Sequence, residues 1–150
     1  MTLKTDLRCI ESGKIDKFNV VQNRFTNARI RPLKQGTTVV LVYDTYVENT
    51  VDILRWNVAF LKGKSGIKDV ICIPQVMNLE DELIRACNIS NIEELTKSKT
   101  KTNYKKDIIR CTNLGARLSQ CEFEISKLWN KHPNNMFKEF GNDSEKIKIC

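Results

Sequence analysis

Three carboxylates follow closely on two apolar runs of the sequence, and their type suits chemistry on phosphate esters. Asp44 ends the first run, Glu48 comes four residues later, and Glu80 follows the second run at 69–73. Phosphodiester hydrolysis or transfer develops negative charge on the attacking and leaving oxygens, and Mg²⁺ or Mn²⁺ held by carboxylates neutralises that charge. We therefore predict that Asp44, Glu48 and Glu80 are the catalytic and metal-binding residues, with Mg²⁺ or Mn²⁺ as the cofactor.

The acids near Glu80 also allow a purely structural interpretation. Asn78 is a good N-cap, and residues 80–82 would then place three acids in the first turn of a helix. Negative side chains at that position are stabilised by the helix dipole. On the sequence alone, both interpretations of Glu80 stay open.

Two buried strands joined by a helix are predicted to bring the carboxylates together. Residues 37–43 and 69–73 are mostly β-branched or aliphatic on both faces, which is typical of central parallel strands. Between them, apolar residues recur at helical spacing: Val51, Leu54, Val58 and Leu61. In such a βαβ unit, covering 37–74, the carboxyl ends of both strands meet at one edge of the sheet.

The remaining pattern predicts an α/β fold with a small, mainly parallel sheet of three or four strands, flanked by helices. A further short strand is predicted at 17–22, and a helical C-terminal extension at 78–130. We expect a single α/β domain over 1–130, followed by a polar C-terminal tail over 131–150.

Positive charge lies on either side of an acidic middle. The net charge is +5 over residues 1–35, −4 over 36–96, +5 over 97–110 and +1 over 111–150. A carboxylate-rich centre with cationic margins suits a site that acts on a phosphate backbone, although an acidic sheet edge with solvated lysines gives the same pattern. The predicted nucleic-acid-binding residues are Arg29, Arg31, Lys99, Lys101, Lys105 and Lys106.

Several protein classes do not suit this sequence. No apolar run approaches the roughly 20 residues of a membrane span, and the first ten residues lack the apolar core of a signal peptide, so we expect a cytoplasmic protein without a membrane partner. The six cysteines show no CxxC spacing, and the one histidine, His132, has no partner at ligand spacing. This pattern argues against a disulfide framework and against structural zinc.

The order of these elements resembles the second half of a Toprim domain, the topoisomerase–primase fold. The similar segments are 40–46, 70–75 and 78–83, and the resemblance covers roughly residues 17–110. The layout is most similar to RloB-like bacterial defence proteins, which also have a basic stretch like the one around Tyr104. The resemblance implies a Rossmann-like sheet and metal-dependent nuclease activity on nucleic acid, in bacterial or mobile-element defence.

Two positions depart from the family pattern. Where the family has an Asp-x-Asp pair, this chain has Asp44 and Tyr46, and no apolar strand here precedes a Glu-Gly pair like that of the family's first strand. A tyrosine hydroxyl is a poor ligand for Mg²⁺. Two hypotheses follow: a degenerate or partial Toprim-like protein that acts on or binds nucleic acid, and a non-catalytic protein-interaction module of a larger assembly, with a protein partner or a second copy of itself.

Overall fold

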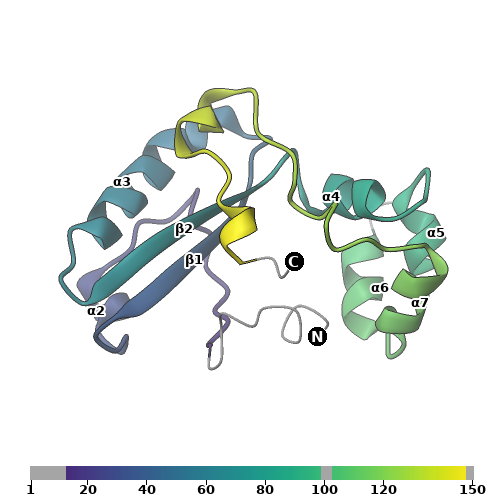
Figure 1. Cartoon of the computed structure of the whole chain (residues 1–150), viewed down its shortest axis with the longest axis horizontal. Coiled ribbons are helices and arrows are strands. Elements are labelled where there is room, and N and C mark those ends of the chain that lie inside the picture. The colour runs from purple at the N-terminus through teal and green to yellow at the C-terminus, as the bar shows by residue number, and fades with distance from the viewer. Residues whose placement is uncertain (1–12, 99–102, 148–150) are drawn as a thin grey trace.

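The computed structural model describes residues 13–98 and 103–147, which form an α/β arrangement. The elements in chain order are α2 (Asn27–Ile30), β1 (Thr37–Asp44), η1 (Glu48–Thr50), α3 (Val51–Lys62), β2 (Ile67–Gln75), α4 (Leu79–Ala86), α5 (Ile92–Thr96), α6 (Tyr104–Arg110), α7 (Leu114–Gln120), η3 (Met136–Phe140) and η4 (Ser144–Lys146). Figure 1 shows α3 lying along the two strands, whereas α4 to α7 gather beyond one end of the sheet. The predicted α/β class is therefore confirmed.

The two strands run parallel and are joined through α3, as predicted. They pair from Thr37 opposite Ile67 to Asp44 opposite Gln75. In the part of the chain that the structure describes, the sheet consists of these two strands, so the prediction of three or four strands is not met there.

Residues 17–22, which we predicted to be a strand, form no strand and enter a turn. The buried side chain of Asn57 on α3 holds this turn. Its Nδ2 donates to the carbonyl oxygens of Val20 and Asn23, both at 2.8 Å. Its Oδ1 accepts from the backbone N–H of Phe25 at 2.7 Å. The prediction failed because a contact with a distant part of the chain outweighs the local β propensity.

Helix α3 buries the apolar face that its spacing predicts. The four residues concerned are all buried: Val51, Leu54, Val58 and Leu61. They share one core cluster with Leu41 and Tyr43 of β1 and with Val70 of β2. Burying one such aliphatic side chain contributes about 1.5–3 kcal/mol, so this layer is a main source of the stability of the sheet.

The segment assigned to a polar C-terminal tail contributes to the core. Phe137 is fully buried, and its ring centroid lies 5.8 Å from that of Tyr43. Asp143 lies along the outer edge of β2, where its N–H donates to the Cys72 carbonyl at 2.9 Å and its Oδ2 accepts from the Cys72 N–H at 3.1 Å. The C-terminal segment, yellow in Figure 1, therefore covers an edge that would otherwise expose unpaired backbone groups.

Helices α4 to α7 form their own small core, which buries Ile92, Leu95 and Tyr104. Asn78 caps α4 as predicted, since its side chain accepts from the N–H of Asp81 at 3.2 Å. Every helix within the described ranges is too short or too polar to span a lipid bilayer.

Candidate functional site

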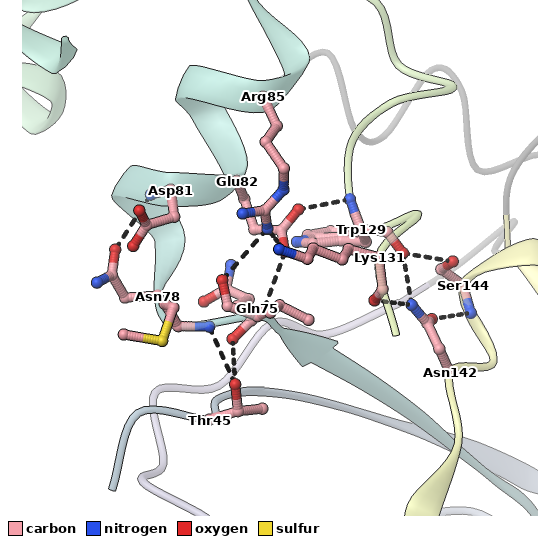
Figure 2. A network of polar contacts seen from close by, with 12 residues as sticks. Thr45, Gln75, Asn78, Asp81, Glu82, Arg85, Trp129, Lys131, Asn142 and Ser144 are labelled. Atoms are coloured by element: carbon pink, nitrogen blue, oxygen red, sulfur yellow. Dashed lines mark hydrogen bonds and ion pairs between the residues drawn. The ribbon is translucent and has the colours of Figure 1, made fainter. Parts of the chain in front are cut away.

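The carboxyl ends of β1 and β2, which we call the carboxyl edge, are joined by the buried residue Thr45. Its N–H donates to the carbonyls of Gln75 at 3.2 Å and Met77 at 3.1 Å. Its hydroxyl donates to the Gln75 carbonyl at 3.2 Å and accepts from the Met77 N–H at 3.0 Å. The two hydroxyl contacts, drawn in Figure 2, fix the chain beyond both strands, where Asp44 pairs with Gln75 at the end of the sheet.

Glu82 fixes α4 at this edge. Its side chain is fully buried, with Oε1 accepting from the Val76 N–H and Oε2 from the Trp129 N–H, both at 2.9 Å. Arg85, at the next turn of the helix, forms an ion pair with Glu82 and donates to the Val76 carbonyl at 3.2 Å. Figure 2 shows Glu82 between the end of β2 and the C-terminal segment. Glu82, one of the three acids for which we considered a helix-dipole role, is thus buried and anchors α4.

The carboxyl edge brings the predicted residues Asp44 and Glu80 near α6. Burial raises the pKa of Asp44, and the nearby Lys105 ammonium opposes this shift. Burial also raises the pKa of Tyr104 to about 12, and three negative charges add to the shift: those of Glu80, Asp44 and Asp81. The charges of two of the three predicted carboxylates, Asp44 and Glu80, therefore act on Tyr104 of α6.

The third predicted ligand, Glu48, contacts the C-terminal segment. Its Oε2 accepts from the backbone N–H of Met136 at 3.4 Å. Tyr46, where the family has its second acid, is 58% exposed. Within residues 13–98 and 103–147, no group of three or more His, Cys, Asp or Glu side chains could hold a metal ion. Asp44, Glu48 and Glu80 therefore do not come together as one group of three in that part of the chain, and the Mg²⁺ or Mn²⁺ site stays a prediction.

Two of the predicted nucleic-acid-binding residues, Arg29 and Arg31, lie at the opposite, amino end of the sheet. Arg29 forms an ion pair with Asp16 at 2.6 Å, and its guanidinium lies 4.2 Å from the ring centroid of Phe18. Arg31 is exposed. Arg29 is thus engaged within the chain, whereas the side chain of Arg31 faces solvent.

Two of the other four predicted contacts lie on α6. Lys105 and Lys106 are exposed residues of this helix. Lys99 and Lys101 lie outside the described residues. The four residues that the structure describes therefore lie in two separate regions, at α2 and on α6.

Two basic segments that are far apart in the sequence meet at the amino end of the sheet. Residues 24–35 precede β1, and residues 62–68 lead from α3 into β2; the side-chain amide of Gln35 joins them by donating to the Ser65 carbonyl at 3.0 Å. These segments, which we call the basic end, hold seven basic residues and no acidic one: Arg24, Arg29, Arg31, Lys34, Lys62, Lys64 and Lys68. Among the described residues, Arg29 alone of the seven forms an ion pair.

An aromatic pair on α3 lies beside the basic end. The rings of Trp56 and Phe60 stack with centroids 4.8 Å apart and planes inclined by 16°. The Arg24 guanidinium lies 5.2 Å from the Trp56 ring centroid, and the Lys64 ammonium lies 4.4 Å from that of Phe60. Such cation–π contacts are worth about 0.5–1 kcal/mol at exposed sites, and they orient the cations without neutralising them. Sequence reasoning missed this pair, although its i, i+4 spacing was the available signal.

A hollow of about 560 Å³ opens between the two basic segments, and we call it the basic-end hollow. Its wall joins apolar side chains to two cations: Ala28, Ile30, Leu33, Ile67, Arg31 and Lys64. An apolar concave wall with a few convergent polar groups is the usual composition of a ligand site.

Comparison with known proteins gives no significant match to a family model, a curated protein or a solved structure. The Toprim resemblance therefore stays a proposal. The carboxyl edge and the basic end are the two candidate sites of this chain.

Proposed function

We propose that this chain is a Toprim-like protein that binds nucleic acid through phosphate contacts at the basic end. The observation that supports the proposal most directly is the meeting of residues 24–35 and 62–68, two segments that hold seven basic residues and no acidic one, with Arg29 paired to Asp16. Six of the seven have no ion-pair partner among the described residues. Their fields add over one surface and raise the local concentration of a polyanion.

The release of counterions supplies the affinity of such a surface. Each phosphate that a lysine or arginine neutralises frees condensed cations, so log K falls with log salt by about 0.7 per contact on a single strand. With about five contacts, raising the salt concentration from 50 to 200 mM should weaken binding about 100-fold.

Fluorescence anisotropy with a labelled oligonucleotide tests the proposed surface. The double variant Arg31→Ala/Lys64→Ala should bind about 10-fold more weakly than the wild type at low salt, because it loses two phosphate contacts. The matched control is Lys131→Ala/Lys138→Ala, which removes the same charge from exposed positions of the C-terminal segment. Equal losses in the two variants would show that overall charge, rather than the basic end, attracts the nucleic acid.

Metal-assisted cleavage is a second candidate function, supported by the parallel register that sets Asp44 opposite Gln75, a few residues before Glu80 on α4. A nuclease assay on DNA and RNA with Mg²⁺ or Mn²⁺ decides it. Cleavage by the wild type that is lost in Asp44→Ala would support an active site at the carboxyl edge. Absence of cleavage in both proteins removes this candidate, and absence of binding as well would leave the hypothesis of a protein-interaction module.

A further inference from the structure

The wall of the basic-end hollow is chemically different from the charged surface around it. Ile30, Leu33 and Ile67 line the hollow beside Arg31 and Lys64. Leu33 is 42% exposed, so part of this apolar wall is open to water. An apolar wall does not stabilise a hydrated phosphate. It does stabilise a flat base, because the faces of the base are removed from water there.

Lys64 connects the hollow to the aromatic pair of α3. It lines the hollow, and its ammonium also lies over the ring of Phe60, at 4.4 Å from the centroid. A phosphate bound by this oriented cation would have its adjoining base within reach of the hollow. Proteins that bind single strands without sequence preference combine a positively charged groove with aromatic side chains, and here the aromatic pair lies beside the hollow rather than in its wall.

We propose that the basic-end hollow takes an unpaired base of a single-stranded nucleic acid, while Arg31 and Lys64 bind the neighbouring phosphates. This inference rests on the proposed function and names the class of ligand for it. A duplex keeps its bases stacked and paired, so it offers only phosphates and sugars to such a surface. The excess of cations over acids at the basic end favours a polyanion over an apolar peptide as the occupant.

The charge of the basic end and the apolar wall of the hollow predict opposite preferences between duplex and single strand. Measuring which of the two binds more tightly therefore distinguishes the two contributions. The duplex has the higher density of phosphates, so purely electrostatic binding favours duplex over single strand. A base that enters an apolar hollow adds a contribution that only the single strand can make. A preference for single strands therefore cannot come from the charge of the basic end.

The test compares the anisotropy of a labelled poly-thymidine single strand with that of a duplex of equal length at one salt concentration. We expect the wild type to bind the single strand about 10-fold more tightly. Leu33→Gln should abolish that preference and leave duplex affinity unchanged. Val42→Gln is the matched control, because Val42 is 40% exposed and lies on β1, outside the hollow; it should change neither affinity.

The possible results separate this inference from the function on which it rests. Binding to duplex and single strand with equal affinity, or a Leu33→Gln variant that keeps the preference, would overturn the inference and leave the proposed function standing. Displacement of the single strand by polyglutamate as readily as by unlabelled poly-thymidine would also overturn it, because the hollow would then be a general polyanion site. Absence of binding to either nucleic acid would remove the proposed function itself.

Discussion

The two ends of one small sheet are built in opposite ways. At the carboxyl edge, buried polar side chains tie the strands, α4 and the C-terminal segment together, chiefly through Thr45 and Glu82. At the basic end, six cations have no ion-pair partner in the described part of the chain. Buried polar networks that are satisfied fix a unique geometry, whereas exposed charges that are not paired create a field for a ligand.

Two cations show what this difference means. Arg85 is engaged by the buried Glu82 and by the Val76 carbonyl. Lys64 lies over the ring of Phe60 and beside the hollow. Removing Arg85 should therefore damage the fold, whereas removing Lys64 should damage binding and leave the fold intact.

The largest expected effect comes from Glu82→Ala, which should destabilise the protein by about 3–5 kcal/mol. The substitution leaves the Arg85 guanidinium and two backbone N–H groups without their acceptor. Urea denaturation measures the loss. The control is Glu80→Ala on the same turn of α4, which should cost at most about 1 kcal/mol because it removes only a dipole contribution. Similar losses in the two variants would contradict the assignment of Glu82 as the anchor.

Asn57→Ala should cost about 2–4 kcal/mol, because it leaves two carbonyls and one N–H group near Val20 without partners. The same change frees the turn that leads to Arg24, so oligonucleotide affinity should also fall. Denaturation and anisotropy on one preparation measure both effects. Asn49→Ala, at an exposed position, should stay within about 0.5 kcal/mol of the wild type. An Asn57→Ala variant with wild-type stability would show that the turn does not need this side chain.

Titration of Tyr104 tests whether the acids of the carboxyl edge raise the pKa of this tyrosine. Its pKa is raised to about 12, by burial first and by Glu80, Asp44 and Asp81 in addition. Because the pKa in the folded protein exceeds the ordinary tyrosine value of 10.0, Tyr104 contributes stability below pH 10.0 that is lost as the pH rises toward about 12. Asp44→Asn should lower this pKa in an ultraviolet titration of tyrosinate in a Tyr46→Phe background, and Lys64→Ala should not. If the pKa of Tyr104 is unchanged in Asp44→Asn, the Asp44 carboxylate does not act on Tyr104.

The smallest expected effect on stability is that of Arg24→Ala. It removes the cation over Trp56 and should cost about 0.5–1 kcal/mol. Its effect on binding should exceed that of Lys138→Ala, because the charge is lost from the basic end. If Arg24→Ala lowers the free energy of unfolding more than it lowers the free energy of oligonucleotide binding, Arg24 acts mainly in stabilising the fold.

Local patterns in the sequence predicted the elements that carry their own signal. Strands β1 and β2, the buried face of α3 and the Asn78 cap were all read correctly, because each depends on periodicity or on a cap within a few residues. The strand predicted at 17–22 was wrong, because the conformation of these residues depends on their contacts with Asn57.

The candidate sites depend more on contacts between distant residues, which the sequence does not display. An acid such as Glu82 looks the same in sequence whether it faces solvent at a helix N-terminus or anchors the helix from inside the core. Likewise, residues 62–68 join the basic end only because the parallel register sets Ile67 opposite Thr37. Strand order led us to expect Asp44 and Glu80 at one edge of the sheet, and that stays a prediction. The hydrogen bond from the Met136 N–H to Glu48 joins residues that are far apart in the chain, so it has no local signal in the sequence.

The salt dependence of oligonucleotide binding tests the central claim most directly. For about five contacts, the wild type should show a slope of log K against log salt of about −3.5, and Arg31→Ala/Lys64→Ala a slope of about −2. Lys131→Ala/Lys138→Ala should keep the wild-type slope. Identical slopes in all three proteins would contradict the account, because they would mean that the basic end does not contact the phosphates.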